Sequence, residues 1–154
     1  LLLLKDMTED VFKKVEKYLT VFPLSGSNIS VNVNTAPEIV LKSIFRFVAA
    51  QQSLAQASDA DSLTKALIAY RQGDDGRLCT ADDQLIDSTK TGGIGLSPTE
   101  QAIYLTASSY NYVKDSSDFF RATIKGTDRL YRVSSSVDMV IDRQNSSVVL
   151  WKRK

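Results

Sequence analysis

Apolar residues recur at the spacing of an α-helix through the first two thirds of the chain. The first such segment starts after Thr8, a residue type that caps helices, and continues through Val11 and Val15. Lysines occupy the opposite side, and Pro23 and Gly26 are expected to end the segment. The pattern predicts a short amphipathic helix near the N-terminus.

A second helix is predicted after a short alternating stretch at residues 30–34. Thr35 and Glu38 have the spacing of a capping box, and Pro37 falls in the expected first turn. The helix would present an apolar stripe of Val40, Leu41, Ile44, Phe45 and Val48.

Two more helices are predicted downstream. The third is expected to open at Asp59 or Asp61 and to end at Gly73. Ser97 and Glu100 form a second capping box, which predicts a fourth helix. Their apolar residues are Leu63, Ala66, Leu67 and Tyr70 in the third and Ile103, Tyr104 and Ala107 in the fourth.

The spacing changes to that of strands after about Ser108. Phe119–Lys125 and Tyr131–Asp142 alternate apolar and polar residues, and Asn145 with Ser146 is expected to turn the chain back into a last strand. These segments predict a three-stranded antiparallel meander. Three strands bury little by themselves, so we expect them to pack on a helix, a larger sheet or a partner.

The pattern therefore predicts an α+β fold in two parts. A helical domain is expected over residues 1–108, with a glycine-rich and acidic loop at residues 73–95, and a β meander is expected over residues 109–154. A loop of this length inside a compact domain is often functional.

Composition excludes several kinds of site. The 154 residues are 43% hydrophobic and 24% charged, which is typical of a globular protein, and the net charge of +1 argues against binding nucleic acid by bulk charge. The chain has no histidine, so His-dependent catalysis and His-containing zinc sites are ruled out. Cys79 is the single cysteine, so no disulfide forms within the chain.

The N-terminal run Leu1–Leu4 is too short to span a membrane. The chain is expected to be a processed or truncated piece without its own signal peptide.

The acidic loop is the best candidate for a metal site. Asp74, Asp75, Asp82 and Asp83 surround a glycine-containing turn, and carboxylate oxygens are the ligands that Ca²⁺ prefers. The spacing is not that of an EF-hand, and an ordinary acidic surface loop is the alternative. The sequence offers no other cofactor site, because Gly92–Gly95 lacks the Lys-Ser/Thr of a phosphate-binding loop.

Three passages resemble one protein family. Val31–Pro37, followed by Glu38, Val40 and Leu41, is similar to the NVNTAP signature of type II secretion minor pseudopilins of the K type. Leu1–Thr8 and Tyr18–Pro23 resemble the segment before that signature, while Phe119–Thr123 and Val149–Lys152 resemble the final strands.

The resemblance implies an architecture and a role. A K-type pseudopilin is a pilin-like protein with a large helical insert of helix-hairpin-helix or SAM-like type, and this chain would hold the later insert and the last pilin strands. The N-terminal membrane helix and first pilin strands of the family are absent from it. The family is not enzymatic: it caps the pseudopilus tip at the periplasmic face of the inner membrane by binding the I and J minor pseudopilins. Some members bind calcium in the helical domain.

A DNA-binding module of the helix-hairpin-helix type, as in competence proteins, is the alternative. Its signature opens in the same way, but the stretch Leu41–Phe47 lacks the hairpin glycine, and Phe45 and Phe47 would hinder a close approach of backbone to phosphate. Arg71 is the remaining point of similarity.

The C-terminal strands are the expected partner surface. They carry the aromatic residues Phe119, Phe120, Tyr131 and Trp151. A partner strand or helix would bind there if these rings were exposed. The other interpretation, which we favour for most of the rings, is that they form the chain's own core.

Overall fold

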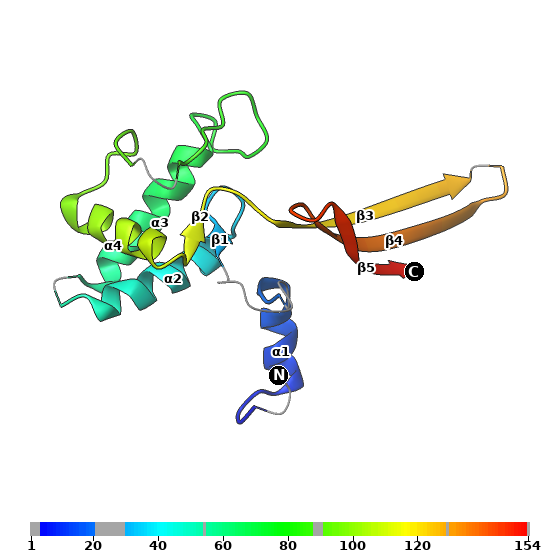
Figure 1. Ribbon diagram of the computed structural model, residues 1–154, viewed down its shortest axis with the longest axis horizontal. Helices are drawn as coiled ribbons and strands as arrows, with labels where there is room; N and C mark the ends of the chain where they lie inside the picture. The colour runs from blue at the N-terminus through cyan, green and yellow to red at the C-terminus, as the bar shows by residue number, and fades with distance from the viewer. Residues whose placement is uncertain (1–3, 21–29, 54, 88–90, 129, 154) are drawn as a thin grey trace. The chain divides into compact units, whose positions relative to one another are not determined.

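The computed structural model describes residues 4–20, 30–53, 55–87, 91–128 and 130–153 of this mixed α+β chain. It divides into two compact units, Leu1–Ser116 and Ser117–Lys154 (Figure 1). Residues 109–116 belong to the helical unit because β2 (Val113–Lys114) pairs in parallel with β1 (Val31–Asn32). Among the described residues, no helix is long and apolar enough to cross a membrane.

The first helix starts where the sequence predicts. Helix α1 covers Glu9–Val15 and continues as the 3-10 turn η1 (Glu16–Tyr18). Thr8 is the N-cap, and its Oγ1 accepts a hydrogen bond from the backbone N–H of Val11 at 3.2 Å. The predicted stop at Pro23 and Gly26 lies outside the described residues.

The second helix starts without the predicted capping box. Helix α2 covers Glu38–Gln51, its N-cap is Pro37, and no side chain caps it. Thr35 instead donates its backbone N–H to the carbonyl of Asn32, because the chain leaves β1 through a turn that the Asn32 side chain also stabilises. The capping-box prediction for Thr35 and Glu38 is therefore wrong.

The third helix starts earlier than predicted. Helix α3 covers Ala57–Arg71, with Gln56 as N-cap. Asp59 lies in the first turn, where its carboxylate accepts the backbone N–H of Gln56 at 2.7 Å, so neither Asp59 nor Asp61 opens the helix. The predicted stop is confirmed: Gly73 follows with a left-handed φ of 61°.

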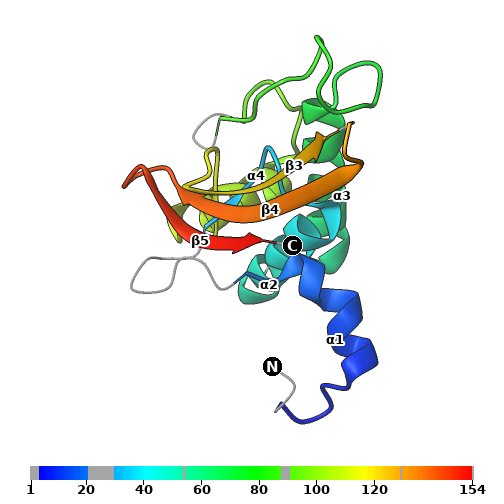
Figure 2. The same ribbon diagram turned by 90° about the vertical axis from the view of Figure 1, so that its right-hand side faces the viewer.

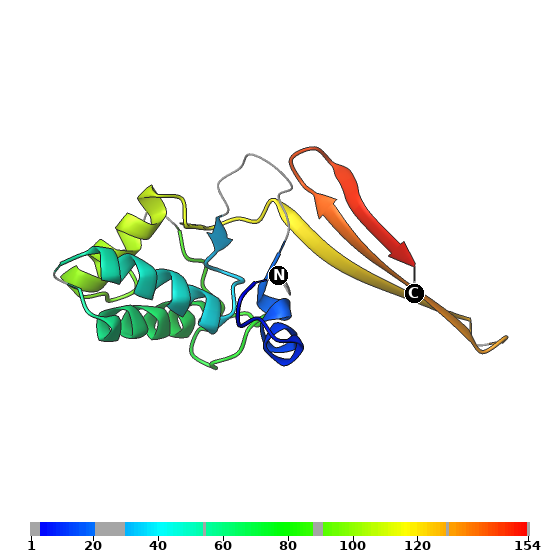
Figure 3. The same ribbon diagram turned by 90° about the horizontal axis from the view of Figure 1, so that it is seen from below.

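Helix α4 (Pro98–Ser109) has the predicted capping box, since Ser97 and Glu100 exchange side-chain and backbone hydrogen bonds. It packs against α2 and α3, which also contact each other (Figure 3). Fully buried side chains from the three helices form the core of this unit, the largest being Leu41, Phe45, Leu63, Leu67, Ile103 and Tyr104.

The second unit is the predicted antiparallel meander. Strand β4 (Val133–Asp142) lies between β3 (Phe119–Asp128) and β5 (Ser147–Arg153), and the strand order is β3-β4-β5 (Figure 2). The β3–β4 register is regular over all ten pairs. The β4–β5 register shifts between Val140 and Ile141, which leaves Val149 without an opposite residue.

Candidate interaction surface

The register of the meander gives the sheet one apolar face. Paired residues of antiparallel strands point to the same side, so Phe120 is opposite Ile141, Ala122 opposite Met139, and Ile124 opposite Val137. Strand β5 adds Trp151 opposite Met139 and Val148 opposite Ile141. We call this set the apolar face; it comprises Phe120, Ala122, Ile124, Val137, Met139, Ile141, Val148 and Trp151.

The apolar face is uncovered. Trp151 is 63% exposed, Ile124 56% and Phe120 46%, values that are unusual for large apolar side chains on one side of a sheet. The expectation that most C-terminal aromatic rings form the chain's own core is therefore wrong, since Tyr131 is exposed as well. The cause is geometric: these three strands are too few to fold over their own apolar side.

The opposite side of the sheet is polar and satisfies its own groups. Asp138 is buried there, and its carboxylate contacts the Arg121 guanidinium at 3.3 Å and accepts the hydroxyl of Thr123 at 2.7 Å. At the end of the strand, hydrogen bonds from the side chain and backbone of Asn145 lower the pKa of Asp142. The two faces thus differ in composition: this side combines polar and charged groups with the apolar Val140 and Leu150, whereas the apolar face has no charged side chain among its paired residues of β3 and β4 from Phe120 to Ile124.

Such a surface is suited to binding another polypeptide. Contiguous exposed apolar patches on proteins mark interaction sites, because covering them removes apolar area from water. The exposed side chains of this face are large and apolar, so a partner that covers them removes apolar area from water. Such side chains have no groups that could act in catalysis. The sequence identified these strands, but only the strand register shows which residues share the uncovered side.

No protein-family model matches the chain. Searches of curated proteins and of solved structures likewise give no match.

Three of the four aspartates of the acidic loop, Asp75, Asp82 and Asp83, accept hydrogen bonds from the loop itself. Asp75 accepts the backbone N–H of Arg77 at 2.7 Å, and Asp83 accepts that of Cys79 at 2.6 Å. Asp82 accepts the N–H of Asp75 at 3.0 Å, a bond that lowers the pKa of its carboxyl. The carboxylates therefore stabilise the loop by satisfying its backbone.

These contacts leave the calcium prediction open. Within the described parts of the chain, which include Asp74, Asp75, Asp82 and Asp83, no three acidic or thiol side chains are grouped so as to hold a metal ion. The low pKa of Asp82 keeps one oxygen-donor side chain ionised. Calcium at this loop stays a prediction.

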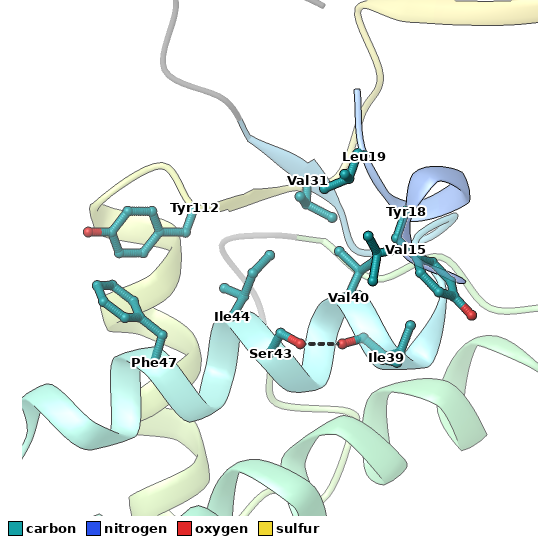
Figure 4. A pocket seen from close by; sticks show the side chains of 10 residues that line it. All are labelled: Val15, Tyr18, Leu19, Val31, Ile39, Val40, Ser43, Ile44, Phe47 and Tyr112. Atoms are coloured by element: carbon teal, nitrogen blue, oxygen red, sulfur yellow. Dashed lines mark hydrogen bonds between the residues drawn. The ribbon is translucent and has the colours of Figure 1, made fainter. Parts of the chain in front are cut away.

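A second apolar surface is a groove of about 540 Å³ between the N-terminal helix and α2 (Figure 4). Helix α2 buries Leu41 and Phe45 in the core but also presents Ile39 and Phe47 outward, each about half exposed. Apart from two tyrosines, Ser43 is the only residue with a hydroxyl among the described residues that line the groove. Its hydroxyl donates to the carbonyl of Ile39 at 2.8 Å. The predicted stripe includes Val40 and Ile44, but helical spacing alone does not separate this second side of α2 from the core side.

The residues that suggested DNA binding have structural roles. Leu41–Phe47 lies inside the continuous helix α2, and the turn to α3 comes only after Gln51. Arg71 is only 5% exposed, and its Nη1 donates to the carbonyl of Val33 at 2.8 Å. Burial lowers the pKa of Arg71, and a side chain so enclosed does not reach a phosphate backbone.

Proposed function

We propose that this chain is the C-terminal part of a K-type minor pseudopilin of the type II secretion system. It acts without catalysis, as a subunit at the periplasmic tip of the pseudopilus that binds the I and J minor pseudopilins. The helical unit is then the later part of the family's insert, of helix-hairpin-helix or SAM-like type, and the meander is the end of its pilin-type sheet.

The uncovered apolar face is the observation that carries the proposal. A protein that works by assembly needs surface that gains free energy when another polypeptide covers it. Exposed Trp151, Phe120 and Ile124 provide such surface, and aromatic side chains are enriched at the centres of protein interfaces.

The structure of the signature segment is consistent with the resemblance. Val31 and Asn32 form β1, the asparagines hold the following turn, and Pro37 leads into α2. Every polar contact described for this segment is structural, so its sequence needs no ligand to explain it.

The test is binding of the purified chain to purified I-type and J-type minor pseudopilins, measured by size-exclusion chromatography with light scattering. We expect a complex with the parent chain and its loss with Ile124→Asp, which places a charge on the apolar face. Ser134→Asp is the matched control, because Ser134 is exposed on the polar side of the same sheet and should leave binding unchanged.

Two results would count against the proposal. Absence of any complex with the parent chain would remove its support, as would equal binding by both variants. Retention of duplex DNA, with an affinity that falls steeply with salt, would instead favour the DNA-binding alternative.

A further inference from the structure

The part of the acidic loop that carries the four aspartates is held at its base by two consecutive residues of the turn after β1. Just before this part, buried Arg71 donates from Nη1 to the carbonyl of Val33 at 2.8 Å. Just after it, the backbone N–H and C=O of Ile86 both bond to the side chain of Asn34, at 2.8 and 3.0 Å. Residues 72–85, which we call the aspartate segment, therefore leave and return at neighbouring residues.

The same two residues hold the end of β2, from which the chain continues to β3. The backbone N–H of Val33 donates to the carbonyl of Lys114 at 2.8 Å and so extends the parallel pairing of β1 with β2. The side chain of Asn34 also donates to the carbonyl of Asp115, at 3.2 Å. Val33 and Asn34 thus lie between the aspartate segment on one side and residues 114–115 on the other.

The carboxamide of Asn34 can connect the two sides because it both donates and accepts hydrogen bonds. Its Oδ1 accepts from Ile86, and its Nδ2 gives one hydrogen bond to the carbonyl of Ile86 and one to that of Asp115. The backbone N–H of Asn34 is in turn held by Oδ1 of Asn32 at 2.8 Å. Since one planar group makes all of these side-chain bonds, a movement of Ile86 also moves the donor that holds Asp115.

Packing joins the same segments. Ile86 is only 1% exposed and belongs to the hydrophobic core together with Val33 and Val113 of β2. Residues that share a core and a hydrogen-bond network tend to open together, as one cooperative unit. Release of Ile86 is therefore expected to loosen the pairing of β1 with β2 as well.

We propose that Val33 and Asn34 act as a conformational relay between the aspartate segment and the residues that lead from β2 to β3. Any change that reorders the aspartate segment alters how firmly residues 113–115 are held, and by linkage a change at residues 113–115 alters the aspartate segment in return. The relay lies within the helical unit. It depends neither on the secretion role nor on calcium.

Amide hydrogen exchange of the whole ¹⁵N-labelled chain, followed by NMR, tests the relay. Ile86→Ala shortens the buried side chain at the end of the aspartate segment, and Ile103→Ala, at a fully buried isoleucine of α4, is the matched control. Ile86→Ala should accelerate exchange of the Val33 amide at least about fivefold more than that of the Phe45 amide inside α2. The control should accelerate both amides alike. Ile86→Val and Ile103→Val give the same comparison should an alanine variant fail to fold.

A second set of variants tests whether Asn34 carries the coupling. Val113→Ala, on the β2 side, should accelerate exchange of the Ile86 amide more than that of the Phe45 amide, because coupling is reciprocal. Both excess effects should disappear when Asn34→Ala is already present. Equal acceleration of the Val33 and Phe45 amides by Ile86→Ala would overturn the proposal, as would excess effects that persist without Asn34.

Discussion

The side-chain amide of Asn34 pairs with both backbone polar groups of Ile86, a residue 52 positions away in the chain. Its Oδ1 accepts the Ile86 N–H at 2.8 Å, and its Nδ2 donates to the Ile86 carbonyl at 3.0 Å. The same Nδ2 lies 3.2 Å from the carbonyl of Asp115. One asparagine of the signature thus connects the turn before α2 to the long loop and to the segment after β2.

Replacing Asn34 should destabilise the helical unit. Asn34→Ala leaves the backbone groups of buried Ile86 without partners, and we expect a loss of about 1–3 kcal/mol in the free energy of unfolding, measured by urea denaturation. Asn34→Asp should be at least as harmful at neutral pH, because a carboxylate cannot donate to a carbonyl. Gln144→Ala, in an exposed turn, is the control. Unchanged stability of Asn34→Ala would show that the loop is held by other contacts.

The two sides of α2 should respond differently to truncation. Phe45 is fully buried, with its ring centroid 6.2 Å from that of Tyr104, so Phe45→Ala should cost about 3–5 kcal/mol. Phe47 is half exposed and contacts Tyr112 edge-on at 5.8 Å between centroids, so Phe47→Ala should cost at most about 1.5 kcal/mol. Thermal unfolding of both variants measures the difference, and similar losses would contradict the assignment of Phe47 to an exposed groove.

Asp61 should make stability depend on acidic pH. Its carboxylate accepts two hydrogen bonds of 2.7 Å from Arg46 and lies 3.0 Å from Lys42, and these contacts hold its pKa far below the usual range. A carboxyl whose pKa is lowered by folding stabilises the protein above its unfolded pKa of about 4, and the stabilisation is lost as the pH falls below that value.

Urea denaturation from neutral pH down to about pH 3 tests this expectation. The parent chain should lose more stability over the acidic range than Asp61→Asn, which lacks the titrating group. Glu9→Gln removes the exposed Lys13–Glu9 pair and should leave the pH profile of the parent unchanged. Parallel profiles for the parent and Asp61→Asn would refute the role given to this ion pair.

Gly73 should not tolerate a side chain. Its φ of 61° is left-handed, and an added Cβ would collide with the backbone of Asp82. Gly73→Ala should therefore lose more than about 1 kcal/mol of stability, because the left-handed conformation alone costs that much. Gly92 faces open space, so Gly92→Ala should stay within about 0.5 kcal/mol of the parent in the same denaturation assay.

The calcium prediction has a direct calorimetric test. If the acidic loop binds Ca²⁺, titration of metal-free protein should release or absorb heat, and Asp82→Asn should weaken the signal because it removes an ionised oxygen donor. Glu100→Gln, at the start of α4, is the control for a general loss of negative charge. Absence of heat at millimolar Ca²⁺ would dismiss the site.

Local signals in the sequence located most of the elements but not all of their starts. The Ser97 capping box and the stop at Gly73 are confirmed, since both depend on residues a few positions apart. The predicted capping box at Thr35 is wrong because Thr35 belongs to the turn after β1, where its backbone N–H bonds to the carbonyl of Asn32. Strand β1 in turn forms by pairing with Val113 and Lys114, which are far away in the sequence. Asp59 or Asp61 was predicted to open the third helix, but α3 starts at Ala57, and Asp59 lies in its first turn.

The sequence by itself determined the α+β class, the helices with their core stripes and the three alternating strands, because helical and strand periodicities are properties of neighbouring residues. It also excluded histidine chemistry and an intrachain disulfide. Only the tertiary structure decided that Trp151 and Ile124 are exposed, that Arg71 is buried and that α2 has a second apolar side. Burial depends on what lies opposite a residue in space, and that is set by strand register and helix packing rather than by local spacing.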